Sequence, residues 1–346
     1  MPLAKKLMGK PVMSVDNPPL VTVVIPAYNE AETIAAAINS VMQQSFTNFE
    51  LLVIDDGSTD DTAEISAAIA DPRVQVLSFD NQGLAASRNR GIRHATGELI
   101  AFLDADDLWT PNKLHSQVEA LQQHPEAKLA YSWTDCIDED NRFLRHGSHV
   151  HAEGLVYKLL LSRNFMDNGS SPMVRKSAFD EAGVFDESYR AGEDWDMWLR
   201  LAHRYPFTCV PFVQVLYRIR KTSMMSDVSQ QFECVTSILR KGLKRLPASP
   251  EREHIKRAAT ANIHKYLSLR LIETGDTRRH GIQAGRHWRL YITTTPTLFH
   301  RFDKTLFIGS TILLMVILPP TLFAWLRKHA VVFNHLRTQT ITPDSR

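Results

Sequence analysis

The sequence predicts an α/β fold: a mostly parallel sheet flanked by helices, followed by a helical C-terminal region and a hydrophobic membrane segment. Short runs rich in β-branched residues alternate with segments that carry one apolar helical face, and the connections between them are short. Strands joined in this way through helices run parallel, with helices on both faces of the sheet. The 44% of apolar and 23% of charged residues are ordinary for a folded protein.

The first half of the chain gives the clearest periodicity. Residues 21–26 (VTVVIP) form a short β-branched run that ends in proline, as buried strands do. Ile34, Ile38 and Val41 then share one helical face. Ser58 and Asp61 are spaced like a capping box. The predicted strands are residues 21–26, 51–54, 74–77 and 99–103, and the predicted helices include residues 31–44, 84–95 and 112–123.

The second half is less regular. We expect strands near residues 128–133 and 213–219, a helix over residues 195–205 and only helices over residues 229–295. Trp195 and Trp198 lie on the apolar face of the first of these helices, so we expect them in the core. His149 and His151 could suggest a metal, but no third ligand stands at a suitable spacing, which favours a loop.

The composition excludes several classes of protein. A formal net charge of +2 makes no global field for nucleic acid, and no nucleic-acid partner is expected. Three distant cysteines form neither a disulfide framework nor a zinc module, which indicates a reducing, cytosolic environment. Neither a GxGxxG turn after the first strand nor a GxxxxGK[ST] loop occurs, which argues against dinucleotide and P-loop sites.

Polar and acidic groups follow three of the predicted strands. The first strand ends in PAYNE, the second in DDGS and the fourth in DADD. In an open α/β sheet, ligands bind at the carboxyl ends of the strands, so these groups should meet at one edge. A single acidic pair is often only a helix cap or a solvated turn, but three together favour a ligand site.

The residues at this edge suit a nucleoside diphosphate. Asp104 and Asp106, separated by one residue, can hold a divalent cation such as Mg²⁺ or Mn²⁺. Such a cation neutralises a diphosphate and makes it a better leaving group. Asp56 can accept a hydrogen bond from a base, and Tyr28 offers a flat face for stacking.

The motifs VVIPAYNE, ELLVIDDGSTDDT, NQGLAASRNRGI and GELIAFLDADD closely resemble the donor half of family-2 glycosyltransferases, which have the GT-A fold. The later segments SPMVRKSAFDEAGVFDE and AGEDWDMWLRLA resemble the acceptor half of the same family. The motifs occur in the family's order over about residues 20–225. The resemblance implies an enzyme that transfers a sugar from a nucleoside diphosphate donor with inversion.

The resemblance also implies roles for individual residues. Asp104 would lie near the ribose and Asp106 on the metal, as the DXD motif, and Asp194 would be the catalytic base, with Glu193 as its rival. Alternatively, Glu193 and Asp194 only cap the helix that starts at Trp195. The implied donor-binding residues are Pro26, Ala27, Tyr28, Glu30, Asp56, Arg88, Asp104 and Arg220.

Two departures from the family pattern affect the expected chemistry. Arg220 stands where many relatives have a metal-ligating histidine, and arginine cannot ligate a metal. It could hold the diphosphate or be a surface residue. The QxxRW signature of processive synthases is missing, so one sugar per encounter is expected.

The expected function is therefore transfer of one sugar, from a UDP-sugar for preference, to a glycan or lipid-linked acceptor in the biosynthesis of a cell-surface polysaccharide or glycolipid. A hexose or an N-acetylhexosamine is the expected sugar. Two alternatives stay open at this point. One is a nucleotidyltransferase that uses the same acidic strand ends, and the other is a non-catalytic, membrane-bound relative.

The chain is expected to have four parts. Residues 1–19 form a flexible N-terminal arm, which has no apolar signal-peptide region. Residues 20–225 form the catalytic domain, with a donor half at about 20–125 and an acceptor half at about 126–225. Residues 226–300 are helical. Residues 301–346 associate with a membrane.

The last of these parts contains a long uncharged segment. From Thr305 to Leu326 no charged residue occurs, and this reaches the roughly 20 residues that cross a bilayer. We therefore expect the protein at the cytoplasmic face of a membrane, anchored by residues 305–326 as a span or a re-entrant hairpin. Pro319 and Pro320 would break or kink one long helix.

Overall fold

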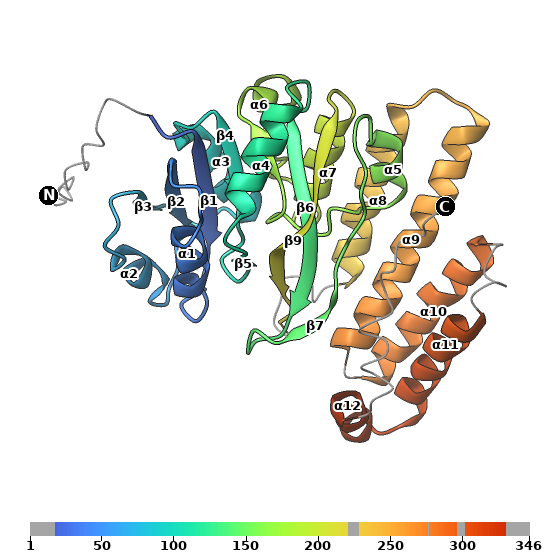
Figure 1. The fold of residues 1–346 in the computed structure, drawn as a ribbon. Helices are drawn as coiled ribbons and strands as arrows, with labels where there is room; N and C mark the ends of the chain where they lie inside the picture. Colours follow the sequence, from blue (N-terminus) through green and yellow to red (C-terminus); the bar gives the residue numbers. More distant parts are fainter. Residues whose placement is uncertain (1–17, 221–227, 276, 296–301, 330–346) are drawn as a thin grey trace, which may run out of the picture.

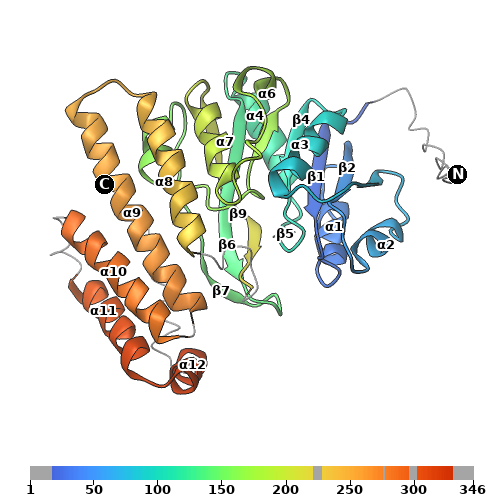
Figure 2. The same ribbon diagram turned by 180° about the vertical axis from the view of Figure 1, so that it is seen from behind.

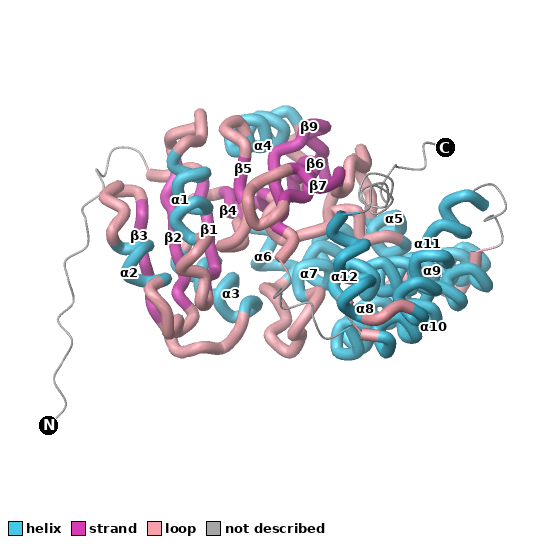
Figure 3. The backbone as a smooth tube through the Cα atoms, turned by 90° about the horizontal axis from the view of Figure 1, so that it is seen from below, coloured by secondary structure: helices cyan, strands magenta, loops and turns pink. Residues whose placement is uncertain are grey.

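The computed structural model describes residues 18–220, 228–275, 277–295 and 302–329. One large sheet with helices on both faces forms the N-terminal part, and a group of helices lies beside it (Figure 1). Seen from below, the strands and this C-terminal group of helices occupy opposite sides of the molecule (Figure 3). The expected N-terminal arm lies almost entirely outside the described residues.

The first four strands run parallel, with β1 between β2 and β4 and with β3 at the edge. The strands and helices predicted here are present, with ends that differ by a few residues. The elements are β1 (Val21–Ala27), α1 (Ile34–Met42), β2 (Phe49–Asp55), α2 (Thr62–Ala67), β3 (Val74–Ser78), α3 (Leu84–His94) and β4 (Leu99–Phe102).

The capping box predicted before α2 is wrong. The side chain of Asp61 makes no capping hydrogen bond. The carboxylate of Asp60 instead accepts the N–H of Thr62 at 3.1 Å and the N–H of Ala31 at 3.1 Å. Ser58 Oγ accepts the N–H of Asn29 at 3.0 Å. These bonds tie the loop after β2 to the loop after β1, because both loops leave the sheet at the same edge.

The second half of the sheet corrects the prediction of a mostly parallel sheet. The strand order is β3-β2-β1-β4-β8-β6-β9-β5, and β7 pairs with β6. Strand β8 lies antiparallel to both β4 and β6, so the sheet is mixed. The elements are β5 (Leu108–Trp109), α4 (Lys113–Gln123), β6 (Leu129–Ile137), β7 (Phe143–His146), α5 (Tyr157–Ser162), β8 (Met173–Arg175), α6 (Ser177–Ala182), α7 (Glu193–Ala202) and β9 (Phe207–Arg218).

The reversed strand does not disturb the direction of its neighbours. Since β8 is antiparallel to both β4 and β6, those two strands point the same way, and β9 runs parallel to β6. The carboxyl ends of β1, β2, β4, β6 and β9 therefore lie along one edge of the sheet. This is the edge where the sequence predicts a ligand site.

Two hydrophobic cores lie on the two faces of the sheet. Side chains alternate along β1, so that Val23 enters one core and Val24 the other. Helices α1 and α4 cover the first face (Figure 1). Helices α3 and α7 cover the second face (Figure 2), where Trp198 packs against Phe102 and Phe185.

The C-terminal helices continue the second core. They are α8 (Val228–Lys244), α9 (Pro250–Thr274) and α10 (Arg278–Thr294). Ile238 and Leu243 of α8 and Ile255 of α9 are buried in the same cluster as Trp198. Tyr157 Oη of α5 also donates to the carbonyl of Gly242 at 2.8 Å. Helices α8 and α9 therefore support the α5–α7 side of the sheet directly.

The predicted membrane anchor is wrong. Among the helices in the described part of the chain, none is both long enough and apolar enough to cross a bilayer. Residues 305–326 are divided between α11 (Phe302–Ile317) and α12 (Pro320–His329), because Pro319 and Pro320 interrupt the helix. The predictions of a membrane-associated segment and of a location at the cytoplasmic face of a membrane depended on this anchor, so they are also wrong.

The side chains of α11 explain why a hydrophobic sequence occurs there. Ile308 and Ile312 are buried against Leu271 of α9 and Trp288 of α10. Met315 packs against Phe323 of α12. The apolar pattern that resembled a membrane span is, on this face, the contact surface of a helix packed against other helices.

The close contact of α3 with β1 gives a testable prediction. A Cβ atom on Gly91 would lie 2.3 Å from Cγ1 of Val24. We expect Gly91→Ala to lower the free energy of unfolding by about 1–3 kcal/mol, because the overlap outweighs the gain in helix propensity. Gly309→Ala in α11 is the matched control, since a Cβ there meets nothing within 4 Å. Urea denaturation measures both, and a Gly91→Ala protein as stable as wild type would contradict the packing.

Candidate active site

Acidic side chains gather at the carboxyl edge of the sheet. Asp104 and Asp106 follow β4, and Glu30 follows β1. Arg220, just after β9, donates to Glu30, and its guanidinium lies 3.9 Å from Asp106. Its side chain is only 16% exposed, so Arg220 is not a plain surface residue. Its guanidinium faces Glu30 and Asp106 of this acidic group.

A second arginine joins the two halves of the sheet domain. Arg88, in α3, donates through Nη2 to Asp104 at 2.6 Å and through Nη1 to Glu193 at 2.7 Å. The Arg88 side chain is 1% exposed. Asp104 belongs to the predicted DXD motif and Glu193 to the first turn of α7. The buried guanidinium of Arg88 therefore links the predicted donor half to the predicted acceptor half, and this pair of contacts is called the Arg88 bridge below.

The surroundings of Arg88 are shaped to hold it. Its guanidinium lies 5.4 Å from the centre of the Phe185 ring. A Cβ on Gly169 would lie 2.3 Å from Nη2 of Arg88, so a larger residue there would displace the guanidinium from its present position. Burial alone would lower the pKa of Arg88, but the carboxylates of Asp104, Glu193 and Asp194 outweigh it and raise that pKa. Arg88 is thus a permanent positive charge beneath the site.

Asp194 lies beside this bridge at the start of α7. Gly192, with φ of 76°, turns the chain into the helix. Burial, followed by the charge of Glu193, raises the pKa of Asp194 to about 7, although Arg88 opposes the shift. A position at a helix N-terminus favours the ionised form of a carboxyl group, so its place in the sequence alone predicts a lowered pKa for Asp194. The structure reverses that expectation, because desolvation and the neighbouring carboxylate dominate.

The first turn of α7 also bears on the alternative that Glu193 and Asp194 only cap the helix. The N-cap residue, Gly192, has no side chain to cap with. Glu193 turns away from the helix end to bind Arg88. Asp194 Oδ1 does accept the N–H of Trp195 at 2.7 Å. Of these two adjacent carboxylates, Asp194 binds a backbone N–H of the first helical turn, whereas Glu193 binds Arg88 of the candidate site.

The surroundings of Asp106, the second aspartate of the DXD motif, shift its pKa strongly. Burial and the nearby charges of Asp104 and Glu30 raise the pKa of Asp106 to about 7, and Arg220 only partly offsets them. Its side chain keeps 25% of its surface exposed. Carboxylate oxygens that repel each other at an accessible edge are a donor set that fits a hard divalent cation.

The predicted nucleoside pocket lies along the ends of β1 and β2. Pro26 and Ala27 are buried in β1, whereas Tyr28 is 48% exposed. The carboxylate of Asp56 is buried and accepts Nη1 of Arg90 at 2.6 Å and the N–H of Gly83 at 2.7 Å. Asp56 therefore orders the loop before α3, and its ion-pair partner is Arg90, whereas Asp104 and Glu193 pair with Arg88.

Three residues that the sequence did not indicate support the DXD loop. Ser170 Oγ accepts the N–H of Asp104 at 3.0 Å and donates to Asp107 at 2.6 Å. Arg218, at the end of β9, donates to the carbonyl of Asp106 at 2.7 Å. Burial and the two neighbouring aspartates raise the pKa of Asp107. The only sequence signal was the third acidic residue of DADD, which a surface turn explains equally well.

Comparison with known proteins identifies the class. The sequence matches the family described as glycosyltransferase-like family 2 over residues 22–270, well over half of the chain. The chain therefore belongs to that family, which makes it a sugar-transferring enzyme by class. Its strand-end carboxylates and Gly192-Glu193-Asp194, here called the GED segment, lie within the matched residues.

Several particular proteins are similar to this chain. The chain is 29% identical over 223 residues to Escherichia coli WfgD, named as a UDP-Glc:alpha-D-GlcNAc-diphosphoundecaprenol beta-1,3-glucosyltransferase, covering 60% of this chain and 80% of that one. It is also 28–34% identical to five uncharacterised glycosyltransferases of Rickettsia species. These matches cover 53–57% of this chain and 26–58% of the length of those proteins.

Two solved structures have the same fold. S. aureus TarS residues 1–349, in complex with UDP-GlcNAc, gives a TM-score of 0.58 at 17% identity, over 89% of this chain and 91% of that one. The mannosyltransferase PcManGT of Pyrobaculum calidifontis, in complex with GDP-Man and Mn²⁺, gives 0.56 at 19% identity, over 93% and 87%. At these identities the likeness is one of fold.

The buried bridge predicts a large loss of stability when it is broken. Arg88→Met leaves Asp104 and Glu193 without their shared counter-ion, so we expect the free energy of unfolding to fall by about 3–5 kcal/mol. Arg142→Met removes an arginine from an exposed pair with Asp140 and should cost less than about 1 kcal/mol. Urea denaturation measures the difference. Equal small losses in both variants would show that the bridge is not a structural anchor.

Proposed function

We propose that this protein transfers one sugar at a time from a nucleoside diphosphate donor to a glycan or lipid-linked acceptor, with inversion at the anomeric carbon. One observation carries the proposal. Arg88 brings Glu193, and with it Asp194, against Asp104, so that a carboxyl group with a pKa of about 7 stands next to the acidic strand ends. Membership of glycosyltransferase-like family 2 supports the same activity.

Asp194 would act as the general base. The acceptor hydroxyl is a poor nucleophile, and Asp194 would take its proton while the oxygen forms a bond to the anomeric carbon. The bond from that carbon to the donor phosphate breaks on the opposite face, and the nucleoside diphosphate leaves with the bonding electrons. A base with a pKa of about 7 is half ionised at neutral pH, which suits this task.

The donor would lie across the ends of β1, β2 and β4. Tyr28 offers an exposed ring to the base, and the buried Pro26 and Ala27 at the end of β1 would lie beneath the nucleoside. Asp56 would order the loop before α3. In this proposal it would also accept a hydrogen bond from the base. A uridine donor is favoured, since WfgD is named for UDP-Glc and TarS was solved with UDP-GlcNAc.

The DXD pair would hold a divalent cation, Mg²⁺ or Mn²⁺. Asp106 and Asp104 are the ligands in this proposal, and PcManGT was solved with Mn²⁺. When bound, the cation neutralises charge on the departing diphosphate. Arg220 faces Glu30 and Asp106, where its guanidinium can also hold a phosphate oxygen.

The acceptor proposal rests on the relatives. WfgD is named for a sugar attached to diphosphoundecaprenol, which is a lipid-linked acceptor. We extend that acceptor class to this chain, together with a place in the biosynthesis of a cell-surface polysaccharide or glycolipid.

A donor screen tests the proposed function. The purified protein is incubated with UDP-, GDP- and dTDP-sugars and an extract of lipid-linked glycans, and release of nucleoside diphosphate is measured. We expect release from one class of donor together with a product heavier by one sugar. Incorporation of the nucleotide itself, or no release with any donor, would contradict the proposal.

The metal is tested in the same assay. We expect EDTA to abolish release, and added Mg²⁺ or Mn²⁺ to restore it. Asp106→Asn should be inactive with or without added cation, while Asp140→Asn, at an exposed surface pair, is the matched control and should keep full activity. Full release in chelator would contradict the metal role and leave the diphosphate to Arg220.

The base is tested by two isosteric variants. We expect Asp194→Asn to lower the turnover rate by about 10²–10⁴-fold with donor affinity unchanged, because only proton removal is lost. Glu193→Gln can still accept from Arg88 and should have a smaller effect. Initial rates and donor titration calorimetry give both quantities. Loss of turnover in Glu193→Gln alone would reverse the assignment, and normal rates in both folded variants would remove the catalytic role of this segment.

A further inference from the structure

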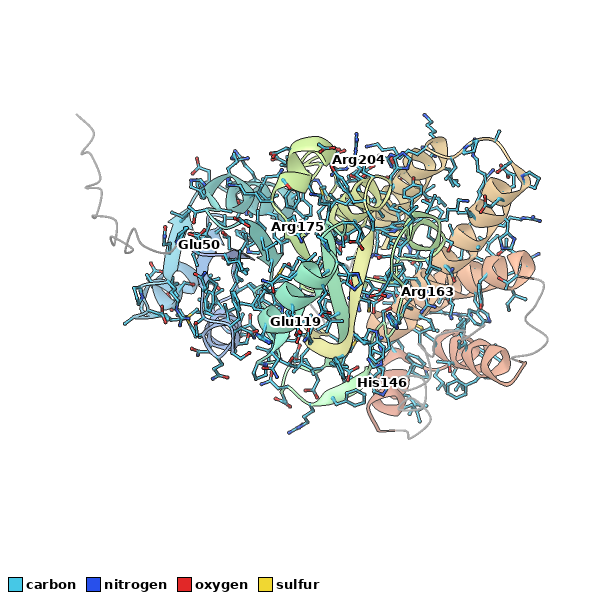
Figure 4. All side chains as sticks on the ribbon, turned by 45° about the horizontal axis from the view of Figure 1, so that its top comes forward. Glu50, Glu119, His146, Arg163, Arg175 and Arg204 are labelled. Atoms are coloured by element: carbon cyan, nitrogen blue, oxygen red, sulfur yellow. The ribbon has the colours of Figure 1, made fainter. Side chains whose placement is uncertain are left out.

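A cluster of two histidines and one aspartate lies outside the residues described above. Asp135 stands near the end of β6, and His146 is its direct partner across the pairing with β7. His146 Nδ1 lies 2.9 Å from Asp135 Oδ1, and His149 Nε2 lies 2.8 Å from the same oxygen. The three atoms all lie within 4.8 Å of one another. In Figure 4 the label of His146 marks this place.

The backbone holds these side chains together. Gly147 donates its N–H to the carbonyl of Thr134 at 2.8 Å, and a Cβ on Gly147 would lie 2.5 Å from that oxygen. Thr134 in turn donates to the carbonyl of Ser148 at 3.3 Å. The two histidines thus flank a close pairing with β6. The Trp133 ring stacks on His149 at 4.8 Å with an interplanar angle of 9°, which fixes the orientation of that imidazole.

The sequence suggested a different pair. His149 and His151 are two residues apart, but His151 faces Glu153 at 3.7 Å and takes no part in the cluster. The missing third ligand comes from β6, and His146 replaces His151. This arrangement depends on the register of the β6–β7 hairpin, which the spacing of histidines alone does not give.

We propose that Asp135, His146 and His149 bind a divalent transition-metal ion, and that Zn²⁺ is the ion they suit best. Two imidazole nitrogens and one carboxylate oxygen are a common zinc ligand set, in which water takes the fourth position. Imidazole favours zinc over Mg²⁺ or Ca²⁺, which prefer oxygen ligands throughout. The side chain of His146 is 55% exposed, which leaves one side of the cluster open to solvent for entry of the ion.

An ion bound at this cluster would stiffen residues 146–170, which support the candidate active site. Ser148, between the two histidines, donates its N–H to Asp167. Two residues further on, Gly169 contacts the guanidinium of Arg88, and Ser170 binds the N–H of Asp104. An ion at the hairpin would hold one end of this short segment while Arg88 and Asp104 hold the other. The inference itself does not depend on sugar transfer.

The test is zinc binding to the full-length protein. Asp106→Asn serves as the background, so that the proposed DXD site does not contribute. Competition with a chromophoric chelator gives the affinity for Zn²⁺, and visible absorption after Co²⁺ substitution reports the imidazole ligands. We expect one equivalent of zinc, with an affinity that His146→Ala and His149→Ala each weaken by at least about tenfold, because even loss of a supporting partner costs that much.

His151→Ala is the matched control, since His151 is as exposed as His146 and also faces a carboxylate, Glu153, but lies outside the cluster. It should leave zinc affinity unchanged. Zinc should also raise the melting temperature of the background protein and of His151→Ala, but not that of His146→Ala. Zinc binding that is absent, or equally tight in His146→Ala, would overturn the proposal and leave the cluster as a hydrogen-bonded pair of histidines.

Discussion

The ion pairs of buried Arg88 are the interaction on which the rest of the site depends. A guanidinium that is 1% exposed is stable only if carboxylates compensate it, and Asp104 and Glu193 do so at 2.6 and 2.7 Å. These partners come from the end of β4 and from the start of α7. The charge on Arg88 thus sets the distance between the DXD loop and α7, and it moderates the pKa of Asp194, which burial and Glu193 raise.

The mixed sheet brings a supporting loop to the contacts of Arg88. Strand β8 inserts between β4 and β6 in the opposite direction, so its preceding loop reaches the carboxyl edge. That loop carries Gly169, which leaves room for Arg88, and Ser170, which holds the backbone of Asp104. A fully parallel sheet would put the start of this strand, and the loop before it, at the other edge. The reversed strand therefore brings supporting groups to the site.

Much of the fold could be predicted because its signals are local. The β-branched runs of β1 and β2 and the apolar face of α1 are periodic, and the DXD and GED segments carry the family resemblance. Strand β8 has three residues and gives no period. The partnership of Arg88 with Glu193 joins residues 105 positions apart and depends on packing that no local pattern contains. The apolar run of α11 led to the wrong prediction of a membrane anchor, because hydropathy does not distinguish a helix in lipid from a helix packed against other helices.

The pH dependence of turnover tests the role of Asp194 most directly. The pKa of this carboxyl is raised to about 7, so the ionised base is lost as the pH falls through that value. Turnover in wild type should therefore rise to a plateau with a midpoint near pH 7. Glu193→Gln removes a negative charge that raises this pKa, so the midpoint should move to lower pH, whereas the charges that raise the pKa of Asp106 do not include Glu193. A flat profile through neutral pH, or the same midpoint in both proteins, would contradict a base at Asp194.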